Sequence, residues 1–252
     1  VEAGRFRFDS VPTLTGRGEL SVTLRDALGR EQTISQPFYA SPRLLAAGLR
    51  EQIIEAGVLR EDFAGADDRY TRPLLAASFR EGLSDRLTWL LRGGATQDRQ
   101  LGGSEINTIV PALGLFSLSA AASNSERGVG GIASLAFERI DDAFSLSLRR
   151  RIASRDYADL GRAPGSIHFS DAARLSWRLP GSGTASLIDV AEQGRADADG
   201  SASTRLAGLG WSQPFGRDLQ AYASWLHALD HADSDSLVVG LTSAFGRGSN
   251  GG

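Results

Sequence analysis

The sequence predicts an all-β fold, an antiparallel up-and-down transmembrane β-barrel of about 12–14 strands. These strands could form a complete barrel or an incomplete piece of a larger one. Three observations lead to this fold class. One segment alternates between apolar and polar residues over a length that suits a bilayer crossing. Similar segments repeat along the chain with turn residues between them. No apolar run approaches the roughly 18 consecutive residues of a transmembrane helix.

The clearest strand is predicted at residues 167–179, IHFSDAARLSWRL. Successive side chains of a strand point to opposite faces, so this segment has one apolar and one polar face. Soluble strands have about 5–6 residues, whereas strands that cross a bilayer need about 9–11. We therefore expect one face to contact lipid and the other to line an aqueous lumen. The lipid-facing residues are Leu175 and Trp177, and the lumen-facing residues are Arg174, Ser176 and Arg178.

The chain opens with a predicted β-hairpin. Residues 18–25 and 31–36 alternate, and the turn between them contains Gly29, which tolerates positive φ. Pro37 is expected to end the second strand. Residues 41–48 are the best local helix candidate, because Pro42 suits a first helical turn and Gly48 an end, although an extended or irregular link fits equally well.

Twelve further strands are predicted from there onward. They cover residues 49–60, 71–82, 85–97, 101–110, 112–122, 129–139, 141–153, 165–180, 182–192, 202–213, 217–228 and 234–245. In the last of them Leu237, Val239 and Leu241 alternate with smaller or polar residues, so we expect these three to face lipid as well. No long segment shows helical periodicity, which argues against α/β and helical-bundle folds.

Composition limits the chemistry. The chain has no Cys, so disulfides and thiolate catalysis are excluded, and its net charge of −3 gives no electrostatic case for nucleic acid. Its motifs form neither a phosphate loop nor a nucleophile elbow. We therefore expect no enzyme activity, no cofactor and no metal. The carboxylates of residues 230–235 could bind a hard cation, but an exposed turn explains them better.

Aromatic and basic residues fit the membrane interpretation. Four tryptophans and three tyrosines are predicted to form girdles at the membrane interfaces, and packing in a sandwich core is the alternative. They are Trp89, Trp177, Trp211, Trp225, Tyr70, Tyr157 and Tyr222. In the Arg149–Arg151 run, alternation places Arg150 on the opposite face from its two neighbours, and we expect the run near a strand end.

Motifs over residues 4–60 resemble the outer-membrane ushers of chaperone–usher pilus assembly. Ushers carry a G-x-L-x-V strand, then P-[FY], LL-x-x-G and a [E/A]-G-x-x-R strand. The matching positions here are Gly18, Leu20, Val22, Pro37, Phe38, Leu44, Leu45, Gly48, Ala56, Gly57 and Arg60. The resemblance continues more weakly through residues 72–89 and 205–229. It departs at residues 52–54, Gln-Ile-Ile, where ushers usually carry an aromatic residue.

The resemblance implies a pore in the outer membrane of a Gram-negative bacterium that assembles and secretes pilus subunits. The implied partners are pilus subunits, periplasmic chaperone–subunit complexes and outer-membrane lipid. Residues 1–40 would match the end of the plug and the return to the barrel, residues 41–246 the barrel strands, and residues 247–252 a disordered tail. Segments resembling the N-terminal domain, the earlier barrel strands, most of the plug and the C-terminal domains of ushers are not found in this sequence.

Two alternatives remain open from the sequence. One is a stand-alone porin-like barrel, and the other is a soluble β-sandwich that serves as a binding or structural domain. The number of strands, the presence of one or two sheets, and the environment of Leu175, Trp177 and Leu241 distinguish these possibilities.

Overall fold

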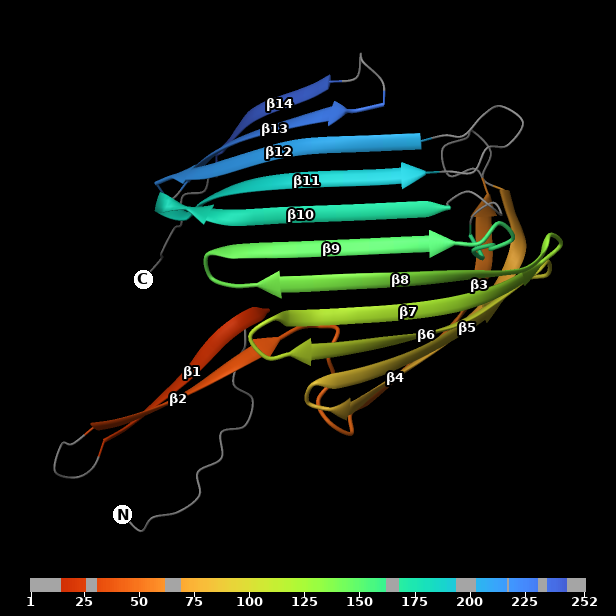
Figure 1. Ribbon diagram of the computed structural model, residues 1–252, viewed down its shortest axis with the longest axis horizontal. Helices are drawn as coiled ribbons and strands as arrows, with labels where there is room; N and C mark the ends of the chain where they lie inside the picture. The colour runs from red at the N-terminus through yellow and green to blue at the C-terminus, as the bar shows by residue number, and fades with distance from the viewer. Residues whose placement is uncertain are drawn as a thin grey trace, which may run out of the picture.

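The computed structural model describes residues 15–25, 31–61, 69–161, 168–193, 203–216, 218–230 and 235–243. These residues form almost nothing but β-strands (Figure 1). The strands are β1 (Gly16–Arg25), β2 (Glu31–Ala40), β3 (Arg50–Glu61), β4 (Arg69–Ser84), β5 (Leu87–Ala95), β6 (Arg99–Val110), β7 (Gly114–Ser125), β8 (Gly128–Ile140), β9 (Phe144–Ala153), β10 (Phe169–Leu179), β11 (Gly183–Gln193), β12 (Ser203–Phe215), β13 (Leu219–Ala228) and β14 (Asp235–Ser243). A 3-10 turn, η1 (Pro180–Ser182), joins β10 to β11.

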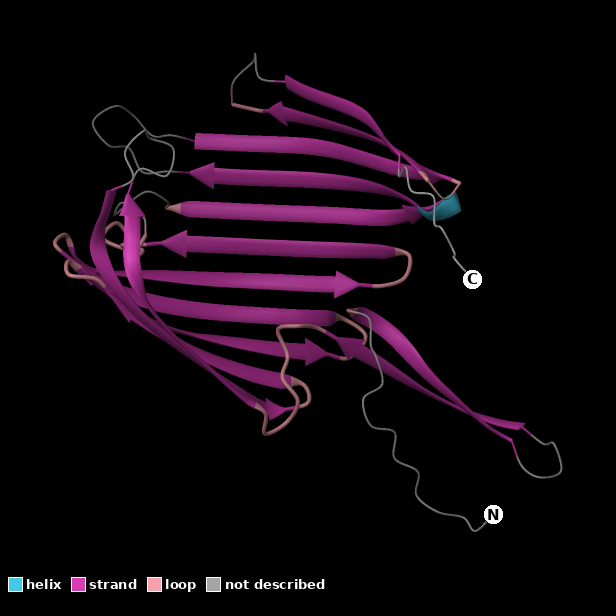
Figure 2. Ribbon diagram, turned by 180° about the vertical axis from the view of Figure 1, so that it is seen from behind, coloured by secondary structure: helices cyan, strands magenta, loops and turns pink. Residues whose placement is uncertain are grey.

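Strands β3 to β14 form one twelve-stranded antiparallel sheet in which each strand pairs with its neighbours in the sequence. All twelve predicted segments therefore correspond to observed strands. Figures 1 and 2 show the sheet curling toward its β3 side, with the β1–β2 hairpin as a separate projection. Within the described residues there is one continuous large sheet rather than the two packed sheets of a sandwich, and β3 and β14 each pair along one edge only.

Two local expectations near the hairpin are resolved. Pro37 does not end its strand, because β2 continues to Ala40 and Pro37 lies opposite Glu19. A two-stranded hairpin leaves one edge of each strand unpaired, and such an edge accommodates a proline that lacks an N–H. Residues 41–48 form turns rather than a helix. Two helical turns are too short to be stable alone, and bonds to the sheet hold this segment instead, including Gly48 N to Gly82 O at 2.7 Å.

Register separates the sheet into two faces. On one face, which we call the apolar face, a row of paired residues runs Leu175, Leu187, Leu209, Trp225 and Leu237 across β10 to β14. The opposite face, which we call the polar face, is rich in Ser, Thr, Gly and Arg, with scattered aliphatic residues. Alternation along every strand is the direct cause of this division.

Several charged residues on the apolar face form ion pairs with a residue of the neighbouring strand. Asp171 pairs with Arg150, with the nearest charged atoms at 3.8 Å, and Asp189 pairs with Arg205 at 3.5 Å. Arg150 also lies over the ring of Phe169, 4.7 Å from its centre. Asp189 lies one residue from the midpoint of β11, so the charges on this face are paired rather than confined to the strand ends.

The two ends of the sheet differ in their connections. At one end, which we call the short-turn end, every connection from β4–β5 to β12–β13 has no more than three residues. At the other end, the long-loop end, the strands are separated by residues 62–68, 154–168 and 194–202, together with shorter connections. No helix long and apolar enough to span a membrane occurs in the part of the chain that the structure describes.

Candidate functional site

The candidate site is a hollow on the polar face between β5 and β9. Its floor is made of small side chains on β7 and β8. Residues that pair across these two strands, such as Ser119 and Ser134, point to the same face of the sheet. Its volume is about 370 Å³. The residues that line it are Arg43, Arg92, Glu105, Ser117, Ser119, Ala121, Ile132, Ser134, Ala136, Arg149, Arg151, Tyr157 and Asp159.

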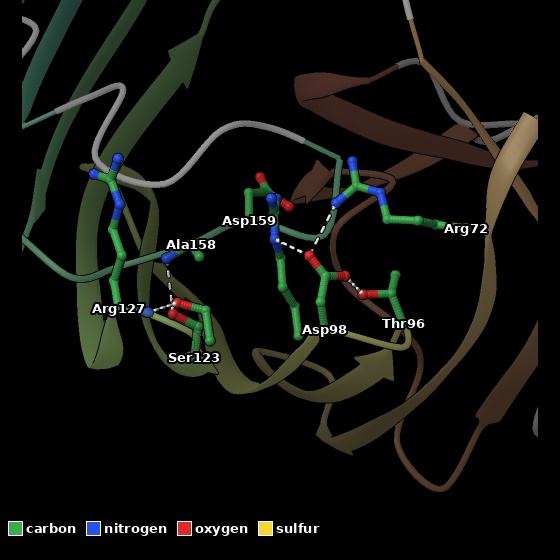
Figure 3. Close-up of polar contacts among 9 residues, drawn as sticks. Arg72, Thr96, Asp98, Ser123, Arg127, Ala158 and Asp159 are labelled. Atoms are coloured by element: carbon green, nitrogen blue, oxygen red, sulfur yellow. Dashed lines mark hydrogen bonds and ion pairs between the residues drawn. The ribbon is translucent and has the colours of Figure 1, made fainter. Parts of the chain in front are cut away.

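Residues 154–161, between β9 and β10, cover the hollow at the long-loop end. Ser154 ties this segment to β8 twice, because its N–H donates to Gly131 O and its Oγ accepts from Gly131 N, both at 2.8 Å. Ala158 N donates to Ser123 Oγ at 2.8 Å (Figure 3). Gly130 permits the close approach, since a Cβ at that position would collide with the Tyr157 backbone.

Residues 41–49 lie against the same face at the short-turn end. Leu45 N donates to the buried Thr88 Oγ1 at 2.8 Å, and Arg43 Nη1 donates to Ser117 Oγ at 3.1 Å. Ser117 Oγ in turn donates to Asn107 Oδ1 at 2.6 Å. Hydroxyl and amide groups on the sheet thus satisfy the segment that covers them, which explains why polar residues are buried on this face.

A charged cluster fixes the long-loop end. Asp98 accepts from Thr96 Oγ1 at 2.8 Å and pairs with Arg72 at 3.3 Å and Arg99 at 3.2 Å. Arg99 also donates to the backbone oxygen of Asp159 at 3.0 Å, so it links the β5–β6 turn to the covering segment. The hydrogen bond from the Thr96 hydroxyl is the largest cause that lowers the pKa of Asp98 below its ordinary value of 3.8. Desolvation opposes it, and the backbone and the two arginines add smaller lowering contributions.

Tyr157 is half-buried in the covering segment and faces the hollow. Burial raises the pKa of Tyr157, and the Asp159 carboxylate raises it further, while Arg92 and Arg151 act in the opposite direction. The phenol therefore stays protonated at neutral pH and can donate a hydrogen bond into the hollow.

The predicted lumen-facing residues Arg174, Ser176 and Arg178 share the polar face. Their ladder partners on β11 are Ile188, Ser186 and Thr184. They lie beside the hollow rather than in it. The alternation predicted for the Arg149–Arg151 run agrees with the strand register. Arg149 and Arg151 line the hollow, whereas Arg150 lies on the apolar face.

The predicted lipid-facing residues all lie on the apolar face. Leu175 belongs to the row that ends at Leu237, and Trp177 belongs to a second row that runs through Trp211 to Val239. Leu237, Val239 and Leu241 are 69%, 71% and 72% exposed and Trp177 is 38% exposed. These side chains are therefore not enclosed in a protein core within the described structure.

The aromatic girdle needs one correction. All four tryptophans lie on the apolar face, as the registers of β5, β10, β12 and β13 show. Tyr222 lies on the polar face, opposite Ser212 and Gly240, and Tyr157 faces the hollow. These two tyrosines are thus not part of a girdle with the tryptophans, because strand alternation and loop folding direct them inward. The side chain of Tyr70 lies outside the described residues.

Metal binding gains no support from the described residues, among which no group of three His, Cys, Asp or Glu side chains could hold an ion. Residues 231–234 of the acidic turn lie outside the described part of the chain, as do residues 247–252. At the edge of this turn His227 contacts Asp235 and stacks on Trp225 at 5.5 Å between ring centres.

The polar segments that cover the hollow were missed by sequence reasoning. Arg92 and Tyr157 were not predicted to meet, because they are far apart in the sequence and lie on different elements. One signal was available, the glycine-rich start of β8. Gly130 in a strand marks the close approach of another backbone.

Together, these features define the class: a curved, up-and-down antiparallel sheet with one apolar and one polar face, the wall of a β-barrel. The comparison with solved structures finds the same fold in the cryo-EM structure of an E. coli P pilus tip assembly intermediate, PapC–PapD–PapK–PapG, in its second conformation. That match has a TM-score of 0.61 and 14% identity, covers 90% of this chain, and covers 30% of the matched chain.

The structure of the P pilus usher (PapC) translocation pore also matches, with a TM-score of 0.42 and 15% identity over 94% of this chain and 56% of that chain. No family model matches the chain, and no curated protein matches it in sequence. The chain thus spans less than two thirds of either matched chain. The usher resemblance seen in the sequence motifs is confirmed at the level of the fold.

Proposed function

We propose that this chain forms part of an outer-membrane usher pore, a non-enzymatic wall through which pilus subunits delivered by a periplasmic chaperone are assembled and secreted. The observation that carries the proposal is the division of one continuous twelve-stranded sheet into an apolar and a polar face. Structural similarity to a pilus assembly intermediate and the usher-like motifs support it.

Leu175, Trp177, Leu237, Val239 and Leu241 face the hydrocarbon in this proposal. A water-exposed patch of this kind would be costly, because each large apolar side chain moved out of water gains about 1.5–3 kcal/mol. Arg174, Ser176 and Arg178 face the aqueous passage, where their polar groups remain hydrated. The partners are pilus subunits, chaperone–subunit complexes and lipid.

The connections suggest an orientation. Outer-membrane barrels have short turns on the periplasmic side and longer loops outside the cell. The short-turn end would then face the periplasm and the long-loop end the exterior. Residues 41–49 lie against the polar face at the short-turn end, so they would line the passage on its periplasmic side.

A stand-alone porin-like barrel is less well supported, because β3 and β14 do not pair with each other in the described sheet. A sheet in lipid must satisfy the backbone groups of both edges. Additional strands would meet that requirement in the pore proposed here.

The test compares two adjacent positions of β10 in the full-length protein. Leu175→Arg places a charge on the proposed lipid face and should reduce folding into vesicles by about 2–4 kcal/mol near the midplane. Ser176→Arg places the same charge on the proposed lumen side and should fold normally. Folding is measured by a heat-modifiable gel shift and secretion by surface pili in a strain that lacks the wild-type protein.

Normal insertion of Leu175→Arg, or loss of insertion with Ser176→Arg, would contradict the membrane assignment. If membrane folding follows the prediction but wild-type protein restores no pili, then the barrel assignment stands and the secretion role is wrong.

A further inference from the structure

Four arginines and two acidic residues line the hollow on the polar face. The arginines are Arg43, Arg92, Arg149 and Arg151, and the acids are Glu105 and Asp159. Four cations against two anions leave an excess of positive charge around a volume of about 370 Å³. A ligand that enters this hollow would be selected for negative charge.

Three of these arginines have guanidinium groups available for a ligand. Arg43 is engaged with Ser117, whereas Arg92, Arg149 and Arg151 make no hydrogen bond or ion pair with any of the described residues. Several arginines elsewhere in the described sheet are paired, such as Arg80 with Glu51 and Arg50 with Glu81. A guanidinium group that lacks a partner inside a hollow can offer several N–H donors in one plane.

The register places these arginines on opposite walls. Arg92 lies on β5, and Arg149 and Arg151 lie two residues apart on β9. Ser119 on β7 pairs with Ser134 on β8, which pairs with Arg151. Since Ser119 and Ser134 are small, they leave room above the floor and present hydroxyl donors from below. The Tyr157 hydroxyl adds a donor from the covering segment.

From this arrangement we infer that the hollow binds a multivalent oxyanion of the phosphate class. Basic walls, hydroxyl donors and an open volume match a ligand with several negatively charged oxygens, which guanidinium groups bind bidentately. The ligand is a dissolved anion rather than a lipid headgroup, because the hollow opens on the face opposite Leu175 and its apolar row. This inference is independent of whether the pore secretes pilus subunits.

The experiment is a calorimetric titration of the full-length protein with pyrophosphate in a non-ionic detergent free of phospholipid. We expect saturable binding that weakens with increasing NaCl, because charge pairing is screened by salt. Arg92→Gln, Arg149→Gln and Arg151→Gln should each weaken binding by about tenfold, the effect of losing one charge-assisted hydrogen bond. Sulfate should bind more weakly than pyrophosphate because it has fewer charges.

Two further variants make the test specific. Glu105→Gln removes a negative charge from the hollow and should tighten binding several-fold, a gain that damage to the fold would not produce. Arg178→Gln changes an arginine on the same face but outside the hollow and should leave the affinity within twofold. A gel shift on heating verifies that each variant is folded.

The inference is overturned if folded wild-type protein shows no saturable binding of pyrophosphate. Equal losses with Arg178→Gln and the three hollow variants would also overturn it, since they would indicate a diffuse charge effect. Binding that appears only when vesicles with phosphate-bearing lipids are added would contradict the assignment to a dissolved anion.

Discussion

The β5–β9 part of the sheet and the β10–β14 part have the same strand architecture but very different interiors. All but one of the non-glycine residues buried in the described structure lie in β5–β9 or in the two segments that cover it. These are Ser41, Thr88, Asn107, Leu115, Ser117, Ser123, Ala136, Ala153 and Ala158, with Ala228 as the exception. The β10–β14 part is open on both faces.

This comparison shows that strand pairing alone buries few side chains in the sheet. Burial arises where residues 41–49 and 154–161 fold onto the polar face, and five of the nine buried residues there carry hydroxyl or amide groups. A curved sheet with one face in lipid and one in water does not need a dry interior. The covered part is therefore where we expect substitutions to affect packing, and the open part where they should be tolerated.

The largest effect is expected at Gly130, where an added Cβ would collide with the backbone of Tyr157. Gly130→Ala should displace residues 154–161 and destabilise the folded protein by about 3 kcal/mol, the upper range for overpacking. Gly131→Ala is the matched control, because its Cβ would lie at an ordinary 3.7 Å from Ala121 O. Guanidinium unfolding in detergent, followed by tryptophan fluorescence, measures both, and equal stabilities would show that residues 154–161 are not held against β8.

An intermediate effect is expected at Thr88, whose buried hydroxyl accepts from Leu45 N. Thr88→Val leaves that N–H without its acceptor and should cost about 1–2 kcal/mol, while Thr88→Ser should retain most of the stability. The same change in the open part, Thr184→Val, should alter stability by less than about 0.5 kcal/mol. A similar loss at Thr88 and Thr184 would remove the distinction between the two parts.

The smallest effect concerns pH. Because the folded-state pKa of Asp98 lies below its ordinary value of 3.8, the ionised group stabilises the fold above that pH, and this stabilisation is lost as the pH falls through the lower folded-state value. Thr96→Val removes the first cause of the shift and should flatten this part of the stability curve. The effect is measured as the unfolding midpoint at a series of pH values from 6 down to below the pKa of Asp98. The same pH dependence in Thr96→Val and wild type would show that the Thr96 hydroxyl does not lower this pKa.

Sequence reasoning succeeded where local periodicity decides the structure. The strict alternation of residues 167–179 predicted both the strand β10 and the division of Leu175 from Ser176, because the period of a strand is fixed by its backbone. The interior could not be predicted in the same way. Residues 154–161 have no periodicity, and their position depends on hydrogen bonds to Ser123 and Gly131, which are remote in the sequence.

The central claim is that the two faces of the sheet meet different solvents, and the cysteine-free chain allows it to be measured directly. Single cysteines at positions 173–178 carry a nitroxide label in the bilayer-inserted protein, and collisions with oxygen and with a water-soluble nickel complex are recorded. We expect oxygen to dominate at Ala173, Leu175 and Trp177 and the nickel complex to dominate at Arg174, Ser176 and Arg178. A profile without this two-residue period, or uniform exposure to the nickel complex, would contradict the account.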